Sequence, residues 1–178
     1  MAIIDALQTF SLNQSLALAM GTYDSNILDY GITSGIPTSA NGGGARDMGV
    51  GDDPALKLVV TVTTTFTSGG AGTLQCELQG AIDNGAGAPA AFSVWWQSPV
   101  YALATLVQGE RLYDMDFPRP PAGIAIPRFM KMSYIIGTAT MTAGVIYSRV
   151  QLDREDYAYS STDNSVRGGY PAGINVAN

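Results

Sequence analysis

Strict alternation of apolar and polar residues is the feature that most constrains what this chain can fold into. Between residues 55 and 67 one parity carries the apolar side chains, namely Leu56, Leu58, Val60, Val62 and Phe66. The other parity carries Lys57, Thr61, Thr63 and Thr65, with Val59 as the exception. Successive side chains of a β-strand point to opposite faces, so the pattern predicts a half-buried strand. The many β-branched residues favour the same assignment.

The same period recurs along the chain. It predicts further strands at Thr73 to Ala81, Phe92 to Trp96, Arg111 to Phe117, Arg128 to Gly137 and Gly144 to Leu152. The Gly-rich turn at residues 68–72 predicts that the first two strands form a hairpin. Short strands at this spacing, bounded by Gly and Pro, predict an all-β fold, specifically a jelly-roll-like antiparallel β-sandwich.

The sequence divides into three parts. Residues 1–26 read as an extended N-terminal arm with at most one helical turn, because only Ile3, Leu7 and Phe10 keep helical spacing. Residues 27–153 form the β-sandwich domain. Residues 154–178 show no periodicity but contain Tyr157, Tyr159 and Tyr170. Because disordered segments hold few aromatic residues, the last part is predicted to be a C-terminal arm that lies against a surface.

The inventory of reactive side chains is nearly empty. The chain has no histidine and a single cysteine, Cys76. It therefore lacks the commonest general base and metal ligand, an intrachain disulfide and a cysteine-based zinc site. Cys76 lies on the apolar parity of a strand, which predicts a buried, unreactive thiol. No cofactor and no metal are expected.

Charge is sparse and predominantly negative. Charged residues make up 13% of the chain, about half of the roughly 25% that is usual. Either Thr, Ser, Asn and Gly cover the surface in place of charged residues, or much of the surface is covered by something else. The net charge of −6 argues against a nucleic-acid ligand. No apolar run approaches the length of a membrane span, and the N-terminus lacks the basic region of a secretory signal.

Two other functions have candidate residues. Asp114 and Asp116 share one face of a predicted strand and could form the carboxylate pair of a hydrolase, although a solvated strand face explains them as well. Trp95 and Trp96 point to opposite faces, so one of them is expected to be exposed. An exposed Trp95 beside Tyr101 would suit a carbohydrate-binding module. The few bases and nucleophiles argue against an enzyme.

Several segments of the chain resemble the capsid cement (decoration) proteins of bacteriophages with short tails. The similarity extends from about residue 22 to residue 153. It is carried by Asn-Ile-Leu-Asp at 26–29, Ala-Arg-Asp-Met-Gly-Val-Gly at 45–51, Thr-Leu-Gln-Cys-Glu-Leu-Gln at 73–79, Gly-Glu-Arg at 109–111, and Phe-Met-Lys-Met-Ser-Tyr at 129–134. The resemblance implies a jelly-roll-like sandwich on the outside of an icosahedral phage head, made in the cytoplasm of the bacterial host.

The implied partners are the major capsid protein and further copies of the chain. A homodimer is the first expectation, because two-fold dimers are the commonest closed oligomers, and a trimer is the alternative. The exposed strand faces, including Trp95 and the row Thr61, Thr63 and Thr65, are candidates for this self-contact. The residues expected to contact the capsid or another subunit are Ile3, Leu7, Phe10, Arg46, Asp47, Trp95, Tyr157, Tyr159, Arg167 and Tyr170.

Overall fold

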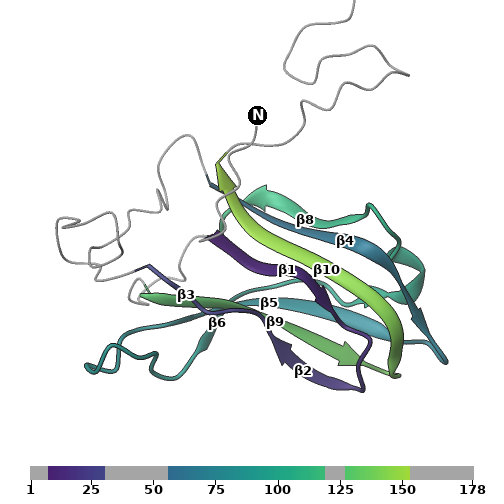
Figure 1. Ribbon diagram of the computed structural model, residues 1–178, viewed down its shortest axis with the longest axis horizontal. Helices are drawn as coiled ribbons and strands as arrows, with labels where there is room; N and C mark the ends of the chain where they lie inside the picture. The colour runs from purple at the N-terminus through teal and green to yellow at the C-terminus, as the bar shows by residue number, and fades with distance from the viewer. Residues whose placement is uncertain (1–7, 31–55, 119–126, 153–178) are drawn as a thin grey trace, which may run out of the picture.

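The chain folds into two antiparallel β-sheets packed face to face (Figure 1). The computed structural model describes residues 8–30, 56–118 and 127–152. The first sheet has the strand order β1 (Thr9–Ser15), β10 (Met141–Leu152), β4 (Leu56–Ser68) and β8 (Arg111–Asp116). The second has the order β2 (Gly21–Asp24), β9 (Phe129–Gly137), β5 (Thr73–Ala81) and β6 (Ser93–Gln97). The predicted all-β sandwich is confirmed.

Three short elements complete the second sheet and its rim. Strand β3 (Leu28–Asp29) pairs with β9, and β7 (Tyr101–Ala102) pairs with β5. The 3-10 turn η2 (Leu103–Thr105) follows β7. Every pair of strands is antiparallel. Most successive strands alternate between the two sheets, and β5, β6 and β7 stay together, which is the order of a jelly roll.

The hairpin predicted for residues 56–81 is wrong. Strand β4 pairs with β10 and β8, whereas β5 pairs with β9, β6 and β7. The Gly-rich loop at residues 69–72 therefore carries the chain from one sheet to the other. Alternation reveals which side chains face inward, but not which strand becomes the neighbour.

The two ends of the sandwich differ. At one end, short loops at residues 16–20, 69–72 and 138–140 connect the sheets. At the other end lies the loop 82–92. The starts of β1, β4 and β9 and the ends of β3, β8 and β10 lie at this end too, and the segments that the structure does not describe begin or end next to them. We call these the short-turn end and the long-connection end.

Residues 9–24 belong to the sandwich, so the predicted arm over residues 1–26 is wrong for them. Strand β1 pairs with β10, and β2 pairs with β9. Phe10 is completely buried in the core rather than available for a capsid contact. The sequence pattern concealed the strand because β1 is irregular: its pairing with β10 shifts register twice, and Asn13 has a φ of 53°.

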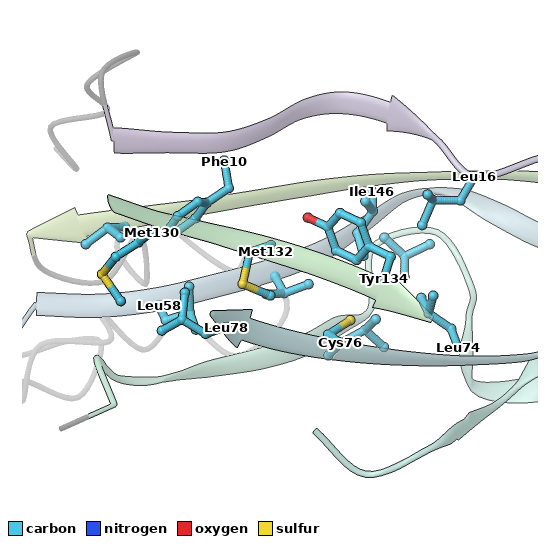
Figure 2. Packing of buried hydrophobic residues seen from close by; sticks show 14 of the residues in the cluster. Phe10, Leu16, Leu58, Leu74, Cys76, Leu78, Met130, Met132, Tyr134 and Ile146 are labelled. Carbon is cyan, nitrogen blue, oxygen red and sulfur yellow. The ribbon is translucent and has the colours of Figure 1, made fainter. Parts of the chain in front are cut away.

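The core between the sheets is built from the predicted apolar parities. Leu58, Val60, Val62 and Phe66 of β4 and Leu74, Cys76 and Leu78 of β5 are all buried. So are Met130, Met132, Tyr134 and Ile136 of β9. Figure 2 shows side chains from both sheets meeting in this layer. Burial of this apolar surface is the main source of stability, at about 25 cal/mol per Å².

One buried hydroxyl connects three strands across that core. Tyr134 of β9 is fully buried, and its hydroxyl lies 2.8 Å from Ser11 Oγ of β1 and 2.6 Å from Ser148 Oγ of β10. Ser11 Oγ also donates to Gln14 Oε1 at 2.6 Å, and Gln14 Nε2 donates to the carbonyl of Asp24 at 3.1 Å. Burial raises the pKa of the Tyr134 hydroxyl well above its usual range, so it stays protonated. This network connects β1 to β10 in its own sheet and to β9 and β2 in the other sheet.

Replacing Tyr134 by Phe should lower the free energy of unfolding by about 1–3 kcal/mol, because Ser11 and Ser148 lose a buried partner. Chemical denaturation monitored by tryptophan fluorescence measures the change. Tyr23→Phe is the matched control, since the Tyr23 hydroxyl makes an exposed hydrogen bond to the carbonyl of Ala19. Equal effects of the two substitutions would contradict a special role for the buried hydroxyl.

Gly144→Ala should destabilise the fold by about 2–5 kcal/mol. Gly144 sits at a register break of β10 with a φ of 142°, and an added Cβ would lie 2.2 Å from Cδ1 of Phe66. Gly69→Ala is the control, because nothing lies within 4 Å of the corresponding position there. Thermal unfolding compares the two variants, and similar melting temperatures would refute the steric argument.

Candidate interaction surfaces

Large apolar side chains that remain exposed lie on the rim of the sandwich. They are Leu12, Leu18, Met20, Ile27, Ile82, Val94, Val100 and Val107. Within the described residues, the four central strands β10, β4, β9 and β5 carry none of these exposed apolar side chains. Scattered single residues of this kind are ordinary, so position and surroundings decide which of them matter.

The loop 82–92 at the long-connection end is anchored by Arg128. Arg128 Nε and Nη2 donate to the two carboxylate oxygens of Asp29 at 2.8 and 2.9 Å, and its Nη1 pairs with Asp83. Its guanidinium also lies 4.8 Å from the ring centre of Phe129. The arginine thereby joins the end of β3 to the start of the loop, and such bidentate pairs have defined geometry.

The loop itself is organised by side chains that cap backbone amides. Asp83 Oδ1 accepts from the amides of Gly85 at 2.8 Å and Gly87 at 3.0 Å, and Asn84 Oδ1 accepts from the amide of Ala86 at 2.8 Å. The hydrogen bonds from Gly85 and Gly87 and the Arg128 charge hold the pKa of the Asp83 carboxyl below its usual value. These caps give the loop a defined backbone conformation.

Trp95 is buried, with 8% of its surface exposed, and not on the surface as the self-contact and sugar-stacking hypotheses required. The register between β5 and β6 shifts beside it, which turns the indole towards the core. It packs over Gly80, where an added Cβ would lie 2.9 Å from Trp95 Nε1 and from Pro127 Cγ. Glycine is therefore required at this point of β5, and Gly80 inside an alternating strand was the available sequence signal.

Trp95 forms one wall of a cavity of about 230 Å³. The other lining residues include Gly80, Ile82, Ala91, Ser93 and Pro127, none of them charged. We call this cavity the Trp95 pocket. The indole Nε1 is buried and has no hydrogen-bond partner. Leaving a buried N–H group without an acceptor costs about 1–3 kcal/mol of folding free energy, so this donor calls for a structural explanation.

The other aromatic and acidic candidates are engaged in the fold. Tyr101 is half-buried and donates from its hydroxyl to the carbonyl of Leu112 at 2.6 Å, so the predicted platform of Trp95 and Tyr101 is wrong. Asp114 pairs with Arg111 at 2.6 Å, and Asp116 pairs with Lys57. Neither carboxylate faces the other across a cleft, because both lie on β8.

Burial raises the pKa of the Cys76 thiol to about 12, and the residue is 1% exposed. The prediction of a buried thiol is confirmed. In the threonine row, Thr65 Oγ1 accepts from the amide of Gln108 at 2.9 Å, and Thr63 Oγ1 donates to the carbonyl of Val145 at 3.3 Å. These two hydroxyls are thus used within the chain.

Eight of the ten predicted contact residues lie outside the described residues. They are Ile3, Leu7, Arg46, Asp47, Tyr157, Tyr159, Arg167 and Tyr170. The two predicted contact residues that the structure does describe, Phe10 and Trp95, belong to the core cluster. Their roles as exposed contacts are corrected, and the other eight stay predictions.

Within residues 8–30, 56–118 and 127–152, no group of three or more His, Cys, Asp or Glu side chains is arranged to hold a metal ion. The same part of the chain contains no helix with the length and hydropathy needed to cross a membrane.

The order of the loop 82–92 should depend on pH. Because the folded-state pKa of Asp83 is lowered, its stabilising contacts are present above about pH 4 and are lost as the pH falls below that value. Amide-exchange protection factors of Gly85 and Gly87 should therefore fall between pH 6 and pH 3, while those of β9 persist. Asp83→Ala, which removes the capping oxygen, should show weak protection at both values. Unchanged loop protection at pH 3 would contradict the proposed capping.

Comparison with known proteins identifies a family but not an activity. A search of curated proteins found no match. Residues 14–150 match the family described as Bbp16. The matched region begins within β1 and ends within β10, and so includes most of the described sandwich. Since the match covers well over half of the sequence, the chain belongs to the Bbp16 family.

Proposed function

We propose that this chain is a structural virion protein, a capsid cement protein. It binds the outer surface of an icosahedral phage head, bridges neighbouring capsomers of the major capsid protein, and stabilises the mature shell. Its sequence resembles such proteins, and its fold is the jelly-roll-like sandwich that the resemblance implies. The proposed mechanism is binding rather than catalysis.

The observation that carries the proposal is the asymmetry between the two ends of the sandwich. The eight predicted contact residues outside the described ranges all belong to segments that join the sandwich at its long-connection end. The anchored loop 82–92 lies at the same end. Segments that all border the sandwich at one end suit a protein that stands on a surface by that end. We therefore infer that the long-connection end faces the shell.

Several modest contacts at that end would act together. Once one segment binds a capsomer, the others bind within the same complex, so their effective concentration is high. A stable contact requires about 1,200–2,000 Å² of buried surface, to which several segments of the chain and the loop 82–92 would contribute. A protein that binds only the expanded shell also stabilises that state by mass action.

The charge of the chain is consistent with an outer position. The net charge of −6 gives no attraction to the phosphate backbone of packaged DNA. Charged residues are also sparse, which suits a protein whose surface is partly covered by partners. A carbohydrate-binding role loses its predicted stacking platform, because Trp95 is buried.

Co-sedimentation of the purified chain with empty expanded heads tests the proposal. We expect saturable binding to the heads and no binding to free capsid protein. Ala86→Glu, which adds a charge to the exposed loop at the long-connection end, should weaken binding at least about tenfold. Ala71→Glu, the same change in an exposed loop at the short-turn end, is the matched control and should bind as the unaltered chain does.

Three results would overturn the proposal. The first is no sedimentation with expanded heads at any concentration. The second is micromolar binding to glycans without binding to heads, which would favour a carbohydrate-binding module. The third result, loss of binding with Ala71→Glu but not with Ala86→Glu, would reverse the proposed orientation of the sandwich.

A further inference from the structure

The loop 82–92 contains a dipeptide that is chemically labile in proteins. Asn84 is followed directly by Gly85, and both residues are exposed to water. The backbone nitrogen of a residue can attack the side-chain amide of a preceding asparagine, which makes asparagine a thermolabile residue. Glycine hinders this attack least, because it has no Cβ. Nothing lies within 4 Å of the position that a Cβ of Gly85 would take, so no neighbouring group shields the site.

The reaction of this dipeptide balances with water as its only co-reactant. The Gly85 nitrogen loses its proton and forms a bond to Cγ of Asn84. The bond from Cγ to Nδ2 breaks, and ammonia leaves with that proton, which closes a five-membered imide. Water then opens the imide at one of its two carbonyls. The product is aspartate or isoaspartate, in which the backbone runs through the side chain, and nothing is oxidised or reduced.

The attacking nitrogen is engaged in the folded loop. The N–H group of Gly85 donates to Asp83 Oδ1 at 2.8 Å, and the same oxygen accepts from the amide of Gly87 at 3.0 Å. The attack requires this hydrogen bond to break. Negative charge would also develop on the Gly85 nitrogen beside the Asp83 carboxylate, and a like charge disfavours an ionised form. Asp83 is therefore placed to slow the reaction.

Two effects at the same place act in the opposite direction, and both are weak. The Asp83 carboxylate could accept the proton as a general base. Its backbone hydrogen bonds and the Arg128 charge hold the pKa of this carboxyl below its usual value, however, which makes it a poor base. The amide of Ala86 donates to Asn84 Oδ1 at 2.8 Å and would stabilise that oxygen during attack. The same bond also holds the carboxamide in its capping position.

The backbone on either side of the dipeptide is held as well. The amide of Asn84 donates to the carbonyl of Ala88 at 2.9 Å, and Asp83 forms an antiparallel bridge with Pro89. Ring closure requires the nitrogen of the next residue to rotate towards Cγ of Asn84, which changes the backbone dihedral angles between them. Reactions of this kind depend strongly on such positioning. The bridge and the hydrogen bond both resist the rotation.

We propose that Asn84-Gly85 is a deamidation site that the contacts of Asp83 keep unreactive in the folded loop. This inference goes beyond the proposed binding function and does not depend on it. Conversion of Asn84 would add a second carboxylate beside Asp83. Isoaspartate would also lengthen the backbone and remove the cap on the amide of Ala86. The caps thus preserve the covalent structure of the loop as well as its conformation.

Peptide mapping by mass spectrometry tests the proposal on the full chain, incubated at neutral pH with and without denaturant. The fraction of Asn84 that is deamidated, and the isoaspartate within it, are measured over time. Asn84 should react at least about tenfold more slowly in the folded chain than in denaturant. Asp83→Ala should raise the rate in the folded chain at least about tenfold. The same dipeptide at Asn41-Gly42 should match Asn84 in denaturant, which checks the digest.

A second variant separates the caps from the ion pairs of the loop. Asp29→Ala removes the other carboxylate that pairs with Arg128 but leaves the hydrogen bonds from Gly85 and Gly87 to Asp83 in place. It should deamidate at the rate of the unaltered chain. Amide-exchange protection of β9, measured on each variant, shows that the sandwich remains folded.

The proposal is overturned if Asn84 of the unaltered chain reacts as fast in the folded state as in denaturant, a comparison that needs no variant. It is also overturned if Asp83→Ala, with β9 still protected, deamidates no faster than the unaltered chain. Equal acceleration by Asp29→Ala and Asp83→Ala would contradict the role assigned to the Asp83 caps.

Discussion

The arrangement of the two sheets depends on the packing of Tyr134 between them. Its ring fills the core from β9, and its hydroxyl meets Ser11 of β1 and Ser148 of β10. A slip of either sheet would leave buried hydroxyls without partners, at a cost comparable to a sizeable share of a domain's stability. This contact therefore fixes the sandwich as one body. It also fixes the irregular strand β1, whose bulge exposes Leu12.

Much of the fold was predictable, because burial of one sheet face imposes a period of two on the sequence. The strands at 73–81 and 129–137 follow their apolar parities closely, and Cys76 is buried as expected. Strand partners were not predictable, since pairing depends on contacts between distant residues. The loop at 69–72 illustrates this: its composition suits a hairpin, yet it crosses between sheets.

The candidate sites were harder to predict than the strands. Bulges shift the parity of the residues around them, which is why Trp95 turned out to be buried and Phe10 was assigned to an arm. The Trp95 pocket depends on Gly80 meeting Trp95 of β6 and Pro127, which precedes β9, and no local pattern reveals this contact. The fold also determines which cations pair with Asp114 and Asp116, namely Arg111 and Lys57. What the sequence indicates best is the shortage of reactive groups.

The proposed role places function in surfaces rather than in a reaction centre, and it assigns the long-connection end to the shell. Electron cryo-microscopy of expanded heads incubated with the chain tests this most directly. The account predicts a sandwich-shaped density outside the shell, with the loop 82–92 directed towards the capsomers and the short loops 16–20 and 69–72 directed outward. Heads without added density, or density with the short loops against the shell, would contradict it.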